Sequence, residues 1–259
     1  MLKKHKINFK KICYFIYLPK MQSLFPIKFD QKLCLSDLIC IEEQKEKIIL
    51  NTENFINNKP SNDVLLWGAR GMGKSSLVKT IIKYFFEKKK NIFLIEILNF
   101  NLNALPEIIY FLNNFDFKFI IFIDDLSLNF NEKDFILFKS LVEGSTIRNP
   151  EKIKFYVTSN LRHLSNKKSE DEESFIDIET KENTDNLISL SDRFGLWIGF
   201  HNSDKKKYLD IVNYYLKKSK IITSNKLIDA AMQWSLEKGN YSGRTAFQFV
   251  SNLISQKKI

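Results

Sequence analysis

Residues 68–75 have the types and the spacing of a phosphate-binding loop. They read Gly-Ala-Arg-Gly-Met-Gly-Lys-Ser, which matches every fixed position of the Walker A pattern G-x-x-x-x-G-K-[ST]. The glycines would let the backbone wrap around phosphate oxygens with its N–H groups pointing inward. Lys74 would reach the β- and γ-phosphates, and Ser75 a Mg²⁺ ion. We therefore expect this loop to bind a nucleoside triphosphate and Mg²⁺, with contacts from Gly68, Ala69, Arg70, Gly71, Met72, Gly73, Lys74, Ser75 and Ser76.

The residues on either side of the loop predict the strand and the helix that such a loop needs. Residues 64–67 form a short apolar run that follows a cluster of breaker residues, as a buried strand would. Beyond Lys74, apolar residues recur with the period of a helix that buries one face. The dipole and free N–H groups of that helix would add to the anion site. A chance Gly-rich turn is the alternative, and this context disfavours it.

Two carboxylates follow another apolar strand. Residues 119–123 read Phe-Ile-Ile-Phe-Ile, and Asp124 and Asp125 come directly after them. This is the form of a Walker B segment, in which Asp124 would join the Mg²⁺ shell and Asp125 would polarise the water that attacks the γ-phosphate. A buried strand that ends in turn-forming aspartates has the same pattern. Downstream of a phosphate-binding loop, we favour the catalytic interpretation.

Asn160 is a candidate for the same site because it ends the strand predicted at 154–159. If that strand is inserted between the phosphate-loop strand and the Walker B strand, the Asn160 amide would lie near the γ-phosphate and the attacking water. The alternative is a loop asparagine that bonds to nearby backbone.

Two arginines complete the set of candidates. Arg193 comes just before the strand predicted at 196–200, so it should project from the domain edge and reach the γ-phosphate of a neighbouring subunit. A surface ion pair with Asp192 is its alternative interpretation. Arg244 follows the apparent N-cap Ser242 and lies in a first helical turn, where a cation opposes the helix dipole. A phosphate contact would account for that position, and a solvated arginine is the alternative.

The elements that must position these residues alternate between strand and helix. This alternation predicts an α/β domain at 35–202, a parallel sheet with helices on both faces. From 203 to 259 only helical patterns appear, which predicts a small C-terminal helical lid domain. Residues 164–186, which include the acidic run 170–173, are charged and aperiodic, so we expect a surface loop or an insertion. The expected strands are 64–67, 92–97, 117–123, 153–158 and 196–200, and the expected helices of the first domain begin at 74, 103 and 132.

The net charge of +10 is weak evidence for nucleic acid. Six lysines and no acid lie in the first twenty residues, and without those lysines the charge is +4. We therefore expect residues 1–34 to be a basic extension outside the folded domains, and Met21 could be the true start. Residues 12–18 are too short and aromatic for a signal peptide, and no run could span a membrane, so we expect a cytoplasmic protein. The three cysteines have no metal spacing and are expected to be reduced thiols.

The order of these motifs resembles that of the AAA+ ATPases. Segments 65–71, 143–144, 158–164 and 189–197 also resemble one bacterial AAA+ group, the domain of unknown function 815, and the likeness runs from about Leu35 to the C-terminus. The resemblance implies ATP as the nucleotide, a helical lid, and an oligomer whose sites lie between subunits, with Arg193 acting in trans. In AAA+ terms Asn160 would be sensor 1, Arg193 the arginine finger and Arg244 sensor 2. The resemblance implies no substrate.

Two residues depart from the wider AAA+ pattern. Asp125 stands where most members carry glutamate, and its shorter side chain would hold the attacking water less well and slow turnover. Cys40 stands where a glycine is usual before the nucleotide pocket, which puts contacts on the adenine side in question.

Three functions are compatible with these patterns. The first is an oligomeric ATPase that remodels an unknown protein or nucleoprotein partner. The second is a nucleotide-dependent switch or binding module with slow hydrolysis. The third is a DNA-associated ATPase, whose direct support is the basic N-terminal segment.

Overall fold

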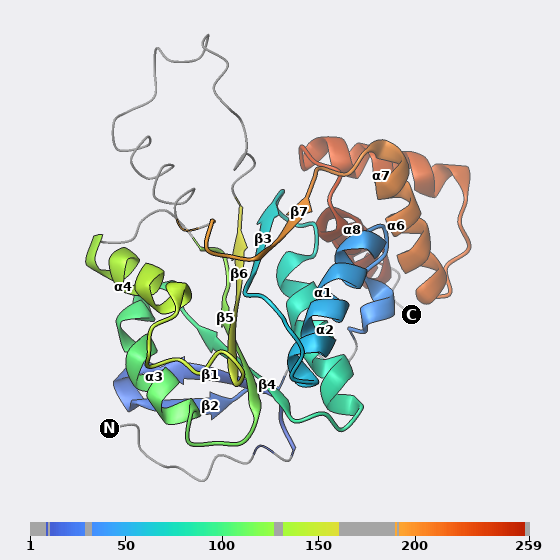
Figure 1. Ribbon diagram of the computed structural model, residues 1–259. Coiled ribbons are helices and arrows are strands. Elements are labelled where there is room, and N and C mark those ends of the chain that lie inside the picture. Colours follow the sequence, from blue (N-terminus) through green and yellow to red (C-terminus); the bar gives the residue numbers. More distant parts are fainter. Residues whose placement is uncertain are drawn as a thin grey trace, which may run out of the picture.

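A seven-stranded sheet lies at the centre of the molecule, with helices on both faces and a helical unit at one side (Figure 1). The computed structural model describes residue 9 and residues 11–28, 33–126, 132–160, 190 and 192–256. All neighbouring strands are parallel except β1 and β2, which are antiparallel. The spatial order is β2 (Ser23–Pro26), β1 (Tyr14–Leu18), β4 (Ile92–Ile97), β5 (Lys118–Ile123), β6 (Ile153–Ser159), β3 (Val64–Gly68) and β7 (Leu196–Phe200).

The helices of the sheet domain form two layers. Figure 1 shows α1 (Glu42–Ile56) and α2 (Lys74–Glu87) on one side of the sheet, with α3 (Leu105–Leu112) and α4 (Glu132–Glu143) on the other. Three short 3₁₀ helices lie in connecting segments: η1 (Pro19–Met21), η2 (Leu35–Asp37) and η3 (Asn99–Ala104). The coverage explains why β6 is buried at every position, since a parallel sheet between two helix layers exposes neither face.

The C-terminal helices form a unit with its own apolar core. These helices are α6 (Lys205–Lys218), α7 (Asn225–Glu237) and α8 (Gly243–Gln256). Tyr208, Val212, Leu216 and Ala246 lie at the centre of a hydrophobic cluster separate from that of the sheet. This unit is the helical lid that the sequence predicts.

Part of the predicted N-terminal extension belongs to the sheet instead. Strand β1 pairs with β4, and β2 pairs with β1, so residues 14–26 are not an extension outside the folded domains. The cause is composition, because the run at 14–18 is aromatic and β-branched and suits a half-buried strand. Phe9 adds to this edge by contacting the rings of Phe15 and Phe93. The basic residues around the run had suggested a solvated tail.

Some expectations lie outside the described residues. These are the charged segment at 164–186, with its acidic run at 170–173, and most of the first ten residues. Among the helices that are described, none is long and apolar enough to cross a membrane.

Candidate functional site

The predicted phosphate-binding loop connects the carboxyl end of β3 to the first residue of α2. All three of its glycines have backbone conformations that other residues rarely adopt, with φ of +116° at Gly68, +75° at Gly71 and +92° at Gly73. A Cβ atom on Gly68 would lie 2.2 Å from the carbonyl oxygen of Phe200, and one on Gly71 would lie 2.7 Å from Ser242 Oγ. The loop is therefore closely packed between the end of β7 and the lid.

Lys74 is buried at the centre of the site. Its ammonium donates hydrogen bonds to the carbonyl oxygens of Gly68 and Ala69, both at 2.8 Å, and to Asn160 Oδ1 at 3.0 Å. Burial lowers the pKa of Lys74 to about 8, although the charges of Asp125 and Asp124 oppose that shift. A buried ammonium held mainly by neutral oxygens is a strong site for an anion.

The side chains of Ser75 and Asp124 meet beside the loop. Ser75 Oγ donates to Asp124 Oδ1 at 2.5 Å, and Thr158 Oγ1 donates to the same carboxylate oxygen at 2.7 Å. Mg²⁺ in proteins is usually held by one or two carboxylates, together with phosphate oxygens and water. The hydroxyl and carboxylate oxygens present here fit that ion.

Asn160 links Lys74 to the second carboxylate. Its Oδ1 accepts from Lys74, and its Nδ2 donates to Asp125 Oδ1. Strand β6 lies between β3 and β5, the position that the prediction for Asn160 required. Asp125 has a φ of +54°, and its backbone N–H donates to Thr158 Oγ1 at 2.7 Å. The structure thus brings Lys74, Asp124, Asp125 and Asn160 together.

The lid contacts the loop through the first turn of α8. Ser242 Oγ accepts a hydrogen bond from the Thr245 N–H at 3.1 Å, as an N-cap residue does. The N–H of Arg244 donates to the Gly71 carbonyl oxygen at 3.0 Å. A Cβ atom on Gly71 would lie 3.2 Å from Arg244 Cβ, so Arg244 lies beside the loop. Burial lowers the pKa of Lys74 most, and the Arg244 charge adds to that shift. Sequence reasoning placed Arg244 near the site but missed this backbone contact.

Arg193 lies away from these residues. It precedes β7, whose last residue Phe200 is paired with Gly68, so Arg193 and the loop lie at opposite ends of that strand. Its guanidinium forms an ion pair with Glu143 at the end of α4. The sequence offered Asp192 as an ion-pair partner of Arg193, and the structure shows a pair with Glu143, which lies fifty positions away in the chain.

The segment before α1 joins the sheet domain to the lid. Asp37 is buried and accepts hydrogen bonds from the Cys34 N–H at 2.7 Å, from Tyr214 at 2.7 Å, and from Lys218. Burial opposes ionisation, but the bonds from Lys218, Cys34 and Tyr214 hold the pKa of Asp37 below its ordinary value. No pattern in the sequence predicted this network. Cys40 has a φ of +62°, a conformation that favours glycine and explains why glycine is usual there.

Comparisons with known proteins agree on the fold. The family model described as "Protein of unknown function (DUF815)" matches residues 10–257. The chain is similar to the Thermotoga maritima RuvB Holliday junction branch migration motor, at 17% identity and a TM-score of 0.54, covering 86% of this chain and 64% of that one. It is similar to Aeropyrum pernix Orc1, solved in complex with DNA, at 12% identity and a TM-score of 0.58, covering 85% and 61%.

A third similar structure is domain III of the Thermotoga maritima replication initiation protein DnaA. The identity is 12% and the TM-score 0.55, and the match covers 90% of this chain and 94% of that domain. No curated protein matches the sequence. At these identities the similarity concerns the fold alone. It confirms the predicted parallel sheet with helices on both faces and a C-terminal helical region. The chain spans less than two thirds of the RuvB and Orc1 chains.

Proposed function

Because the chain belongs to the DUF815 family, whose description gives no activity, we propose its function from the site. We propose that it binds and hydrolyses ATP with Mg²⁺ and acts as an oligomeric AAA+ ATPase on a protein or nucleoprotein partner. One observation carries the proposal. The Asn160 amide accepts from Lys74 and donates to Asp125, so a phosphate-binding cation and a candidate base flank a single side chain.

Binding would begin at the loop. The Lys74 ammonium, now held by the Gly68 and Ala69 carbonyls, would gain stronger charge-assisted bonds from the β- and γ-phosphates. Ser75 and Asp124 would hold Mg²⁺, which supplies neutralising charge to the phosphate oxygens when it is bound. Gly68 to Ser76 would contribute the surrounding loop, and the N-terminal turn of α2 would face the phosphates.

Hydrolysis would depend on Asp125 and Asn160. Asp125 would polarise the attacking water, and Asn160 would orient it through the amide that already joins Asp125 to Lys74. The backbone of Asp125 is fixed by its bond to Thr158. Because aspartate is one methylene shorter than glutamate, we expect slow turnover.

The lid would sense the nucleotide through Arg244. Its backbone bonds to Gly71 of the loop, and its guanidinium would contact the γ-phosphate. Loss of that phosphate after hydrolysis would remove the contact and release the first turn of α8 from the loop. ATP turnover would in this way move the lid.

Arg193 supports an oligomer with shared sites. The four residue steps from Leu196 to Phe200 cover about 13 Å at roughly 3.3 Å per residue, and Arg193 lies before that strand begins. Arg193 thus lies far from its own loop, and we propose that its guanidinium acts on the nucleotide of a neighbouring subunit. We also propose the cytoplasm as the location, in keeping with three free cysteines.

The test is to separate nucleotide binding from turnover. Lys74→Ala should abolish binding of a fluorescent ATP analogue, whereas Asp125→Asn should bind it and lose hydrolysis. Wild-type turnover per subunit should rise with protein concentration, because each site needs a neighbour. Absence of turnover at every concentration, with tight ATP binding, would favour the nucleotide-dependent switch instead.

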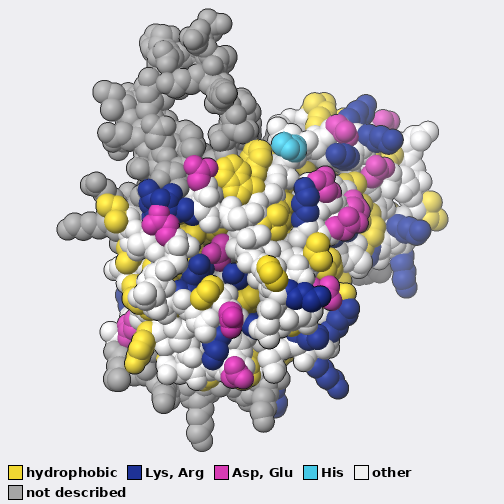
Figure 2. All heavy atoms as spheres, in the orientation of Figure 1, with side chains coloured by type: hydrophobic (Ala, Val, Ile, Leu, Met, Phe, Trp, Pro, Cys, Tyr) yellow, Lys and Arg dark blue, Asp and Glu magenta, His cyan; other side chains and the backbone are white. Residues whose placement is uncertain are grey.

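A DNA-associated ATPase is the second candidate, since two similar structures are a Holliday junction branch migration motor and an Orc1 protein in complex with DNA. On the face shown in Figure 2, Lys and Arg side chains are interspersed with Asp and Glu and form no continuous basic track. The N-terminal lysines can be tested by replacing Lys3, Lys4 and Lys6 with glutamine, which leaves β1 intact. If salt-dependent DNA binding survives that change, the folded domains bind DNA; if it disappears, the binding is electrostatic attraction to the N-terminal segment.

A further inference from the structure

Glu143 and Arg193 form an ion pair on the side of the domain away from the phosphate-binding loop. One carboxylate oxygen, Glu143 Oε1, accepts from both Nε and Nη2 of Arg193. The Arg193 side chain is 27% exposed and the Glu143 side chain 44% exposed. An ion pair with this much solvent contact contributes little to the stability of a fold. Its main effect is on the position of the Arg193 side chain.

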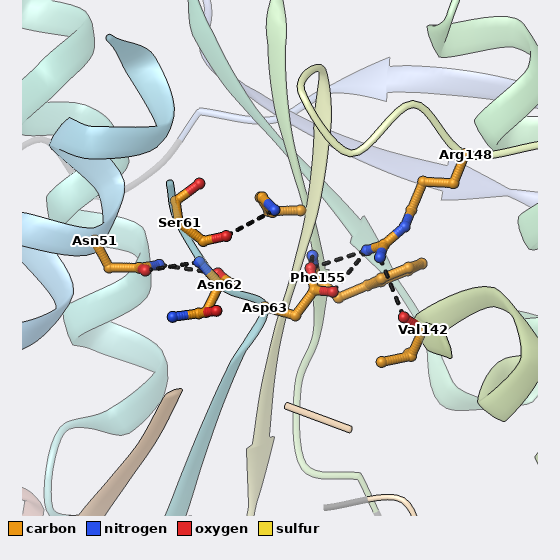
Figure 3. Close-up of polar contacts among 8 residues, drawn as sticks. Asn51, Ser61, Asn62, Asp63, Val142, Arg148 and Phe155 are labelled. Carbon is orange, nitrogen blue, oxygen red and sulfur yellow. Dashed lines mark hydrogen bonds and ion pairs between the residues drawn. The ribbon is translucent and has the colours of Figure 1, made fainter. Parts of the chain in front are cut away.

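A buried ion pair between Arg148 and Asp63 links the end of α4, which carries Glu143, to the residue that precedes β3 (Figure 3). Arg148 Nη1 donates to both carboxylate oxygens of Asp63, at 2.9 and 2.8 Å, and Arg148 Nη2 donates to the Val142 carbonyl at 3.2 Å. The Phe155 N–H donates to the same Asp63 carboxylate at 2.7 Å. Asp63 therefore joins the end of α4 to two central strands.

The turn that carries Arg193 contacts the same segment, Asn62 and Asp63. The Leu196 N–H donates to the Asp63 carbonyl oxygen at 3.3 Å. Gly195 lies so close to Asn62 that a Cβ atom there would be 2.4 Å from Asn62 Oδ1. Asn62 and Asp63, the two residues before β3, therefore contact both the end of α4 and the turn that carries Arg193.

We propose that Glu143 is a positioning residue for Arg193, holding its guanidinium where it meets the γ-phosphate of a neighbouring subunit. This inference rests on the proposed function. A guanidinium has five N–H donors in a planar fork, and Glu143 occupies the edge formed by Nε and Nη2. That contact restricts the orientation of the guanidinium plane. Pre-organisation of this kind matters for the rate, because a misplaced charge stabilises a transition state poorly.

The test uses two kinds of subunit in one assembly. Lys74→Ala subunits keep Arg193 but bind no nucleotide, and Arg193→Ala subunits bind nucleotide but lack the arginine. Each alone should be nearly inactive, and mixing them should restore turnover at the interfaces where one completes the other. Glu143→Gln is then added to one subunit or the other, with Glu53→Gln, an exposed carboxylate on α1, as the matched control.

Glu143→Gln on the Lys74→Ala subunit should lower the restored rate about tenfold, with little change in the KM for ATP. On the Arg193→Ala subunit it should add no further loss, because no arginine is present there to be positioned. Glu143→Asp, which keeps the charge on a shorter side chain, should give an intermediate rate and checks that an unfolded variant is not the cause. Thermal melting of each subunit provides the same check.

Three results would overturn the inference. A restored rate within twofold of the control would mean that Glu143 does not position the arginine, and equal losses from either subunit would mean that its role is structural. If the two kinds of subunit restore no turnover when mixed although both fold, the shared-site mechanism itself is wrong, and the inference that depends on it is wrong as well.

Discussion

Replacing Asp63 with asparagine is the most informative change to the framework of the domain. Asp63 and Arg148 are 8% and 5% exposed, and the two carboxylate oxygens take both contacts from Arg148 Nη1. Asparagine has nearly the same shape, but one oxygen becomes an NH₂ group that faces the guanidinium. The change leaves a buried positive charge without its counter-charge.

The expected cost follows from the contacts that remain. Breaking a buried ion pair by removing one partner costs about 3–5 kcal/mol. Here the asparagine oxygen can still accept from the Phe155 N–H, and the Arg148 guanidinium keeps the Val142 carbonyl and the Phe155 ring, whose centroid is 5.0 Å away. We therefore expect the lower end of that range, about 3 kcal/mol.

Urea unfolding followed by tryptophan fluorescence measures this cost. Trp67 and Trp197 both pack against the core of the sheet domain, so their emission reports on the unit that contains the pair. Asp116→Asn, which breaks the exposed pair with Lys152, is the matched control and should leave the midpoint unchanged. Adding Arg148→Met to Asp63→Asn should recover about 2 kcal/mol, because the unpaired charge is then gone. A loss below about 1 kcal/mol for Asp63→Asn, or no recovery in the double variant, would refute the reasoning.

Three further predictions concern the site and its links to the lid. Asp125→Glu should raise kcat about threefold or more in a steady-state phosphate-release assay, because a longer carboxylate reaches the attacking water better; an unchanged or lower kcat would show that the Asn160 contact requires aspartate. Asp37 has a lowered pKa, so its ionised form stabilises the fold above the unfolded value of about 4 and that stabilisation is lost as the pH falls through the folded value. The difference in Tm between the wild type and Asp37→Asn should therefore be largest near neutral pH and shrink below about pH 4, and a constant difference would contradict the assignment. Cys40→Gly should leave the Tm equal or higher, because relief of a left-handed backbone worth about 1 kcal/mol offsets the added flexibility of glycine.

The sequence predicted those features that depend on residues close together in the chain. The loop at 68–75, the carboxylates after β5 and the asparagine after β6 each follow a short apolar strand, and the carboxyl ends of parallel strands meet at one edge of the sheet. Local pattern and chain order therefore sufficed to bring Lys74, Asp124, Asp125 and Asn160 together.

The features that sequence reasoning missed depend on residues far apart in the chain. Glu143 and Arg193 are fifty positions apart, and Asp37 and Lys218 are separated by 181. Each partner alone looks like an ordinary surface charge, and only the packing of α4 and α6 brings it to its counterpart. Strand β1 was missed for a different reason, because flanking lysines masked a run whose side chains suit a sheet edge.

Strands β3 and β7 connect the two functional ends of the domain. At one end the Phe200 carbonyl accepts from the Ala69 N–H at 2.7 Å, and at the other the Asp63 carbonyl accepts from the Leu196 N–H at 3.3 Å. The strands are in continuous register between these bonds, so the loop and the turn that carries Arg193 belong to one rigid pair. Under the proposed function, a subunit cannot shift its own nucleotide loop without shifting the arginine that it offers to its neighbour. The lid contacts the loop through the backbone bond from Arg244 to Gly71 and through the packing of Ser242 against Gly71. It would then be the part that moves during turnover, and the sheet would carry that change to the next site as a rigid body.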